Sequence, residues 1–212
     1  MTHAHADPAR STRSAAELTN SPLENPRIIR KITRYVSSLG RIFFIVINWN
    51  CRREKNMSLH IVLVEPEIPP NTGNIARTCA ATDTALHLVK PLGFDISEKA
   101  VKRAGLDYWP FVKLEVHDSL EVFLDKYQGK RMFLATTKGG RNYAEVSYRD
   151  EDMILFGRET AGLPRNFIES RRDQAIRIPM SESTRLRSFN LSNSANIILF
   201  EALRQLGFPG LE

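Results

Sequence analysis

The sequence has few cysteines and no cysteine pair. Among its 212 residues, Cys51 and Cys79 are the two cysteines, and neither lies in a CxxC motif. No group of cysteine and histidine residues has the spacing of a metal site along the chain. We therefore expect no disulfide framework and no metal ligands, and a reducing cytoplasm is the simplest setting.

Long apolar runs are also absent. The most apolar run, residues 42–47, is far shorter than the roughly 20 residues that a membrane-spanning helix needs. Basic residues precede this run, as they do in a signal peptide, but no small-residue cleavage site follows it. We therefore expect neither a membrane anchor nor export.

Residues 57–212, which make up most of the chain, carry no excess of positive charge. The formal net charge is +6, but residues 1–56 hold ten basic and four acidic residues, whereas residues 57–212 hold twenty of each. Nucleic-acid binding by the larger part would therefore depend on local basic patches and not on overall charge.

The first quarter also differs in composition. Residues 1–26 are rich in Ser, Thr, Ala, Asn and Pro and show no apolar period, which is typical of disorder. We interpret residues 1–56 as a disordered or non-native extension, with a genuine RNA-binding arm as the alternative, and residues 57–212 as the folded domain. An intact mass near 24.1 kDa for the native protein would contradict a natural start at Met57.

From residue 59 onward, apolar β-rich runs alternate with helical patterns. The runs 61–64 and 153–156 are continuously apolar, as in strands covered on both faces. The alternation predicts an α/β fold, a mostly parallel sheet with helices on both faces. The predicted strands are 59–64, 85–89, 111–116, 131–136, 152–156 and 175–178, and the predicted helices are 73–81, 97–104, 118–127, 164–170 and 190–206. In the last helix the expected buried residues are Ile197, Ile198, Phe200, Leu203 and Leu206.

Three segments with functional character each follow a predicted strand, where open α/β sheets build their ligand sites. The first runs from Glu65 to Arg77 and contains NTGNIAR, in which Asn71 is placed to cap the following helix. A helix N-terminus and the planar fork of Arg77 both favour anions such as phosphate. A plain helix cap with a surface arginine is the alternative.

The second segment is FGRETAGLP, residues 156–164. Gly157 directly follows a buried strand, and glycine lets the backbone turn sharply or approach a ligand closely. Glu159 lies at the end of this strand, where a carboxylate is costly unless it has partners. An ordinary strand–turn–helix connection is the alternative, and the chain contains neither a dinucleotide nor a P-loop phosphate fingerprint.

The third segment consists of IPM at residues 178–180 and RSFNLSNSAN at residues 187–196. Its second part is rich in Ser and Asn and opens the longest predicted helix. One capping residue would suffice for that helix. The surplus of small polar groups indicates a surface that binds a ligand or another part of the site, with an over-capped helix as the alternative.

In this order, the three segments resemble the three motifs of SPOUT RNA 2′-O-methyltransferases, and in particular those of the TrmL (YibK-like) group. The stretches at residues 63–74 and 103–109 (RAGLDYW) support that group. The resemblance covers about residues 58–210. It implies methyl transfer from S-adenosylmethionine to the ribose 2′-hydroxyl of the wobble nucleotide, cytidine or uridine, in the tRNA anticodon stem-loop, with leucine-type tRNAs as the expected substrates.

The resemblance also implies an α/β fold with a C-terminal trefoil knot, and a cytoplasmic homodimer with the first and last helices at the interface. The methyl donor would lie bent in the knot, held near Ala135, Gly157, Ile178 and Ser188. Ala135 departs from the bulkier leucine that is common at this position in the group. No metal is expected, because the sulfonium donor already carries a good leaving group.

The family motif places five residues around the reacting centre: Asn71, Arg77, Glu159, Ser188 and Asn190. Glu159 would hold the loop and Arg77, while Ser188 and Asn190 would orient the donor and the ribose. An arginine side chain stays protonated at neutral pH and makes a poor general base. We therefore interpret Arg77 as an electrostatic positioner of the attacking hydroxyl or its phosphate.

Four basic residues are candidates for contact with tRNA phosphates, with a solvated surface as the alternative: Lys102, Arg103, Lys138 and Arg141. Three histidines lie in or beside predicted strands and are expected to be packed and not catalytic: His60, His87 and His117.

Two functions of other classes remain open. A non-catalytic RNA-binding or assembly module could share this fold, although the intact motif residues argue against it. A nucleotide-binding α/β enzyme of unrelated chemistry is the other, and the missing phosphate-binding loop argues against that one.

Overall fold

The computed structural model describes residues 58–183 and 185–212, so the expected extension 1–56 lies outside the described residues and remains a prediction. In the described part, seven strands form one sheet of order β3-β2-β1-β6-β4-β7-β5. Every pairing in it is parallel. The strands are β1 (His60–Val64), β2 (Ala85–Val89), β3 (Lys113–His117), β4 (Met132–Ala135), β5 (Arg141–Asn142), β6 (Met153–Phe156) and β7 (Ala175–Arg177).

All six predicted strands are confirmed. The sequence pattern missed β5, because a strand of two residues shows no periodicity. The predicted third strand also began too early: residues Trp109–Phe111 form the 3-10 helix η3, with Pro110 in its first turn, and β3 begins after it.

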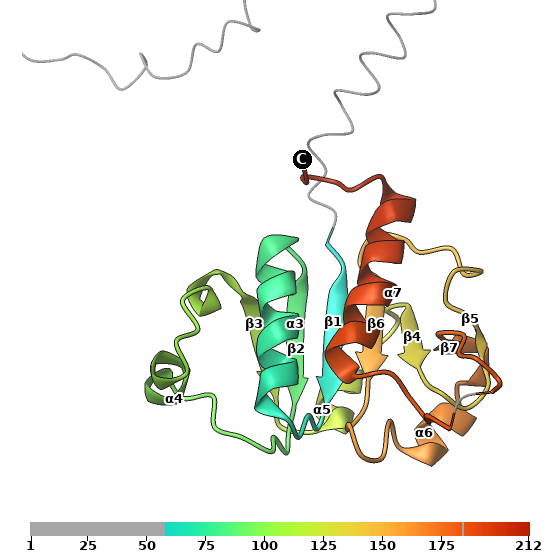
Figure 1. The fold of residues 1–212 in the computed structure, drawn as a ribbon, viewed down its shortest axis with the longest axis horizontal. Helices are drawn as coiled ribbons and strands as arrows, with labels where there is room; N and C mark the ends of the chain where they lie inside the picture. Colours follow the sequence, from blue (N-terminus) through green and yellow to red (C-terminus); the bar gives the residue numbers. More distant parts are fainter. Residues whose placement is uncertain (1–57, 184) are drawn as a thin grey trace, which may run out of the picture. The chain divides into compact units, whose positions relative to one another are not determined.

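Helices cover both faces of the sheet (Figure 1), as the sequence predicted. Helices α3 (Pro69–Ala81) and α7 (Leu191–Leu206) lie side by side on one face. Helices α5 (Leu120–Lys126) and α6 (Arg165–Glu169) cover the opposite face. The short helix α4 (Glu98–Arg103) lies beyond β3 at one edge. No helix within residues 58–183 and 185–212 is long and apolar enough to cross a membrane.

Helix α7 packs through a different stripe from the predicted one. Ile198 and Leu203 are buried as expected, but Ile197 and Phe200 are 36% and 47% exposed. The contact stripe instead runs through the helical spacing Ala195, Ile198, Leu199 and Ala202. Since this stripe faces the sheet and α3, the two larger side chains point outward.

Helix α3 begins four residues before the predicted start. Pro69 and Pro70 occupy its first positions, where proline needs no amide hydrogen and its fixed φ suits a helix. Its N-cap residue is Ile68, which makes no side-chain cap. The predicted capping role of Asn71 is therefore wrong: Asn71 lies inside the first turn, and its buried side chain is available for other contacts.

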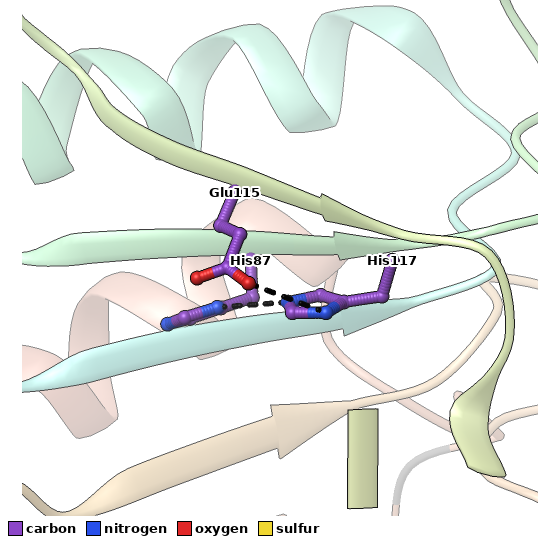
Figure 2. A group of neighbouring side chains, drawn as sticks. All are labelled: His87, Glu115 and His117. Carbon is purple, nitrogen blue, oxygen red and sulfur yellow. Dashed lines mark hydrogen bonds and ion pairs between the residues drawn. The ribbon is translucent and has the colours of Figure 1, made fainter. Parts of the chain in front are cut away.

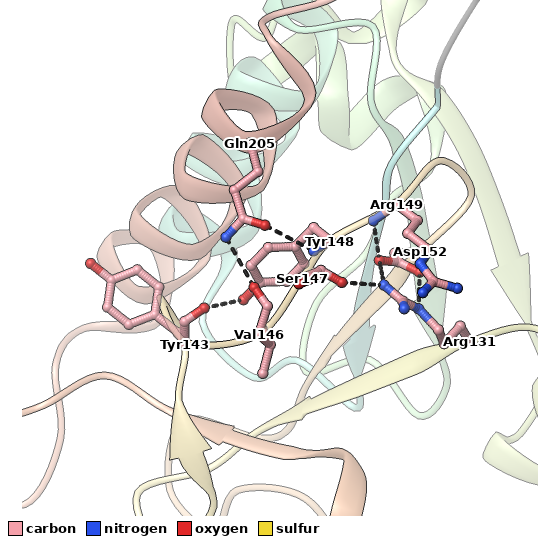
Figure 3. A network of polar contacts seen from close by, with 8 residues as sticks. All are labelled: Arg131, Tyr143, Val146, Ser147, Tyr148, Arg149, Asp152 and Gln205. Carbon is pink, nitrogen blue, oxygen red and sulfur yellow. Dashed lines mark hydrogen bonds and ion pairs between the residues drawn. The ribbon is translucent and has the colours of Figure 1, made fainter.

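Asp152, just before β6, organises the loop that precedes this strand (Figure 3). Its two carboxylate oxygens accept hydrogen bonds from Nε and Nη2 of Arg131 at 2.7 and 2.6 Å, and one also accepts from the backbone N of Arg149 at 2.6 Å. Gln205 of α7 bonds the same loop, at the carbonyl of Val146 and the amide of Tyr148, both at 3.0 Å. The loop thus fixes the end of α7 against the sheet.

We expect Asp152→Ala to lower the free energy of unfolding by about 2 kcal/mol. This is less than the roughly 3–5 kcal/mol for breaking a fully buried pair, because the Arg131 side chain is 38% exposed and can be rehydrated. Urea unfolding of the full chain measures the loss. The control is Glu169→Ala, which removes an exposed pair with Arg165 and should cost about 0.5 kcal/mol or less. Equal losses in both variants would contradict the role of Asp152.

Candidate active site

A cavity of about 830 Å³ opens at the carboxyl ends of β1, β6, β4 and β7. The three segments singled out in the sequence all contribute to its lining: Glu65, Ile68 and Asn71 from the first, residues 156–164 from the second, and Ile178, Met180, Ser194 and residues 187–191 from the third. Parallel strands bring their carboxyl ends to one edge, which is why segments more than 100 residues apart meet there.

The loop after β6 forms one wall of the cavity and folds back on itself. The backbone N of Gly162 donates to the carbonyl of Arg158 at 2.8 Å. A Cβ atom on Gly157 would overlap the backbone of Gly162 and Leu163. Only glycine therefore fits at residue 157, and this close backbone contact gives the wall its shape.

Glu159 holds the first segment in place. Its Oε2 accepts a hydrogen bond from the backbone N of Glu67 at 2.9 Å, and its Oε1 accepts from the backbone N of Ile68 at 3.2 Å and from Nδ2 of Asn71 at 2.9 Å. Three N–H donors thus surround one carboxylate, which offsets the cost of placing a charge at the end of a buried strand.

Asn190 connects this group to the third segment. Its Nδ2 donates to Oδ1 of Asn71 at 2.9 Å, and its Oδ1 accepts from the backbone amides of Ser192 and Asn193 at 2.9 and 3.3 Å, which caps α7. Both ends of its amide are therefore fixed. A continuous hydrogen-bonded chain, Glu159–Asn71–Asn190, joins all three segments at the rim of the cavity.

Two further contacts between the same loops were not predicted. Glu65 forms an ion pair with Arg158. Glu67 accepts hydrogen bonds from the backbone N and Oγ1 of Thr160 at 3.1 and 2.7 Å. Both pairs join the loops that follow β1 and β6, which are neighbours in the sheet. The opposite charges of Glu65 and Arg158 were the signal that the sequence offered for the first pair. This signal could not be used, because the sequence does not show that β1 and β6 are neighbours.

The residues expected around the donor line the cavity: Ala135, Gly157, Ile178 and Ser188. Arg77 does not line it. It lies six residues beyond Asn71, about 9 Å further along the helix axis, and its side chain is 67% exposed. Its contacts within the described part of the chain are an ion pair with Asp107 at 3.8 Å and the Tyr108 ring, 4.5 Å from its guanidinium carbon. The expected contact between Glu159 and Arg77 is therefore not formed.

The four expected RNA-binding residues do not form one patch. Lys138 lines the cavity and also a smaller neighbouring pocket that Arg165 and Arg172 share. Arg141 lies in β5 at the same edge of the sheet, where its Nη2 donates to the carbonyl of Asp173 at 3.1 Å. Lys102 and Arg103 are exposed on α4, at the opposite edge (Figure 1).

Comparison with known proteins identifies a family model, relatives and solved structures that resemble this chain. Residues 58–200 match the model of the SpoU rRNA Methylase family. A relative from Geobacillus stearothermophilus is 51% identical over 158 residues, which cover 73% of this chain and 99% of the relative. The tRNA (cytidine(34)-2′-O)-methyltransferase of Escherichia coli (strain K12) is 48% identical over 153 residues, 72% of this chain and 96% of that protein. A solved structure concerned with 2-OH methylation of C/U34 on tRNA is 44% identical, with a TM-score of 0.65 over 71% of this chain and 97% of its own.

Proposed function

Because the chain belongs to the SpoU rRNA methylase family, we propose that it transfers the methyl group of S-adenosylmethionine to the ribose 2′-hydroxyl of nucleotide 34, cytidine or uridine, in tRNA. The names of its relatives support the substrate. Within the structure, the observation that carries the proposal is the chain Glu159–Asn71–Asn190, which assembles the three segments at the rim of one cavity.

The cavity suits the methyl donor in size and character. Its volume of about 830 Å³ lies within the range of roughly 300–1,000 Å³ that is usual for small-molecule sites. Apolar side chains such as Leu163 and Ile178 line it together with the backbone after β6 and β7. We infer that Ala135, Gly157, Ile178 and Ser188 hold the adenine and ribose of the donor.

The reaction joins the ribose 2′ oxygen to the methyl carbon and breaks the bond between that carbon and the sulfonium sulfur. The 2′-hydroxyl loses its proton, which passes to water at the open mouth of the cavity. The protein contributes mainly alignment, which can lower a barrier by several kcal/mol, up to about 10. Two groups would orient the ribose and the donor. One is Asn190, whose amide is fixed at both ends, and the other is Ser188, which is exposed at the cavity.

Arg77 fits a contact with the RNA better than one with the donor, because it lies exposed outside the cavity. We expect Arg77→Lys to raise the KM for tRNA about tenfold, since lysine keeps the charge but loses the planar fork that grips a phosphate. Steady-state kinetics with varied tRNA measure this. Arg149→Lys, which alters an exposed arginine before β6, at the opposite end of this strand from the cavity, is the control and should leave KM unchanged. Near-normal kinetics of Arg77→Lys would exclude a role that depends on the fork.

We extend the proposal to the anticodon stem-loop as the bound part of tRNA, leucine-type tRNAs as substrates, and the cytoplasm as the location. The basic residues near the cavity, Lys138, Arg141, Arg165 and Arg172, offer the local positive charge that phosphate binding needs. Lys102 and Arg103 on α4 are too far along the sheet to join this patch and would contact a different part of the RNA.

A homodimer through the outer faces of α3 and α7 is the proposed active form. These helices lie side by side, and three large apolar side chains on or just after α7 are exposed: Ile197, Phe200 and Phe208 at 36%, 47% and 40%. Exposed apolar side chains gathered on one face favour a protein interface. An isologous contact of this face with itself would cover all three.

Phe200→Asp is expected to convert the dimer to a monomer, because it would bury two unpaired carboxylates at a symmetric contact. Sedimentation equilibrium gives the mass of the assembly. The matched control, Val122→Asp, changes an exposed apolar residue of α5 on the opposite face and should leave the assembly intact. A monomeric wild-type chain, or a dimeric Phe200→Asp variant, contradicts this interface.

We also propose that the C-terminal segment threads through a loop to form a trefoil knot. The supporting feature is the position of β7 and α7: β7 lies between β4 and β5 in the sheet, whereas α7, which follows it in the chain, packs on β6 beside α3. A crystal structure whose traced backbone is unknotted would contradict it.

Methyl transfer from labelled S-adenosylmethionine to total tRNA from a strain lacking this protein tests the function, with nucleoside analysis of the product. We expect label in 2′-O-methylcytidine or 2′-O-methyluridine. Donor binding without transfer would indicate another RNA target. If the donor does not bind either, a non-catalytic RNA-binding module on the same fold becomes the better interpretation.

A further inference from the structure

Three histidines form a continuous row across neighbouring strands, away from the cavity of the candidate active site. His60 Nδ1 lies 2.9 Å from His87 Nε2, and His87 Nδ1 lies 3.1 Å from His117 Nε2. His87 and His117 are 2% and 3% exposed, so they are packed as predicted from the sequence. The rings of Phe123 and Tyr127 on the α5 side cover the row.

The parallel register brings Glu115 to this row. Glu115 pairs with His87 across β2 and β3, and His117 follows two residues later, on the same face of β3. One ligand atom from each of His87, Glu115 and His117 lies within 4.8 Å of the other two. Figure 2 shows the carboxylate directed at the gap between the two imidazoles.

The spacing is close to that of a zinc site. Two nitrogens on one tetrahedral zinc, each at about 2.0–2.1 Å, are about 3.4 Å apart. His87 Nδ1 and His117 Nε2 are 3.1 Å apart, and their ring planes differ by 25°. A shift of a few tenths of an ångström, with the two rings rotated so that their lone pairs point at one position beside the line that joins the nitrogens, would therefore admit the ion. Two histidines and one carboxylate are also a ligand set that zinc uses.

The ends of the row face carboxylates: His60 Nε2 lies 3.7 Å from Glu151, and His117 Nδ1 lies 3.6 Å from Glu115. Three neutral imidazoles supply three ring protons, which are enough for the two contacts between rings and the one with Glu151. A metal bound by His87 and His117 would take the place of the proton that these two rings share.

The contacts that His87 makes with its second ring nitrogen would also stabilise a bound ion. With Nδ1 of His87 bound to metal, its Nε2–H donates to His60, whose Nε2–H then points to Glu151. Histidine ligands in metal sites commonly donate their second nitrogen in this way to a partner that fixes the tautomer. His60 and Glu151 therefore select the ring form of His87 that a metal requires.

Two side chains from the end of α5 contact the Glu115 carboxylate. Nζ of Lys126 donates to its Oε1, and Oη of Tyr127 donates to its Oε2 at 2.8 Å. For a metal to bind, Lys126 would have to move away from Glu115. Its side chain is 54% exposed, so it can rotate into the solvent.

We propose that His87, Glu115 and His117 form a structural site for one zinc ion, which ties β2 to β3 at the edge of the sheet. Solvent reaches the partly exposed Glu115, so a water can complete four ligands. The ion would stabilise the fold and take no part in methyl transfer, because none of these residues lines the cavity.

The test uses the full chain with His3 and His5, its only other histidines, changed to glutamine. After treatment with a chelator, the protein is titrated with zinc chloride by calorimetry, and the bound metal is counted by native mass spectrometry. We expect one zinc per chain and a higher melting temperature with zinc. Cobalt in place of zinc should give the absorption spectrum of a four-coordinate site.

Three variants assign the ligands. Glu115→Gln and His117→Gln remove ligands and should weaken zinc binding by more than about 100-fold, and His60→Gln, which removes the support behind His87, should weaken it by about 10–100-fold. Glu121→Gln on α5 changes an exposed carboxyl nearby and should bind zinc as the parent does. No zinc bound by the parent, a six-coordinate cobalt spectrum, or unchanged binding by Glu115→Gln overturns the proposal.

Discussion

Replacing Glu159 by glutamine is expected to lower methyl transfer by about 100-fold, the cost of misplacing a catalytic group by about 1 Å. All three groups around the carboxylate are N–H donors, from Glu67, Ile68 and Asn71. A glutamine side chain of the same shape presents one amide NH₂, which must face one of these donors. The first segment then shifts, and Asn190 loses its fixed partner.

Initial rates with labelled donor and saturating tRNA measure the effect, and unfolding in urea shows whether the variant is folded. Glu121→Gln makes the same change at an exposed carboxylate on α5, away from the cavity, and should leave the rate unchanged. A rate for Glu159→Gln within about threefold of the wild type would mean that the hydrogen-bonded chain is not needed for alignment.

Gly157→Ala is expected to abolish measurable donor binding. The added Cβ would overlap the backbone of Gly162 and Leu163, which cannot move as a flexible side chain could. The loop after β6 would have to open, and with it the wall of the cavity against which the donor is proposed to lie. Calorimetry with S-adenosylmethionine measures binding, and we expect methyl transfer to be lost with it.

Gly73→Ala is the matched control. In α3 an added Cβ meets Tyr108 Oη at 3.4 Å, an ordinary contact, and alanine in a helix is favoured over glycine by roughly 0.5–1 kcal/mol. This variant should be at least as stable as the parent and bind the donor normally. If Gly157→Ala also binds the donor with parental affinity, the folded-back loop does not form the donor site.

The sequence by itself determined the elements and the location of the site. Continuously apolar runs such as Ile61–Val64 and Met153–Phe156 indicated strands buried on both faces, and strand–helix alternation indicated parallel pairing. Since parallel strands end at one edge, polar segments that follow them had to meet there. These inferences depend on local composition and chain direction, which a sequence contains directly.

Contacts between segments were decided by the tertiary structure. Asn71 was expected to cap α3, but the two prolines start the helix earlier, and its side chain bonds Glu159 and Asn190 instead. Arg77 was expected near Glu159, but the direction of α3 carries it out of the cavity.

The histidine row was also decided by the tertiary structure. His60, His87 and His117 are about 30 residues apart in sequence, so no short ligand motif joins them, and the order β3-β2-β1 with its register brings them into line. Which side chains of α7 point outward also depended on which side of the helix packs against the sheet. Strand order, register and helix rotation are set by packing of the whole core, and no local pattern encodes them.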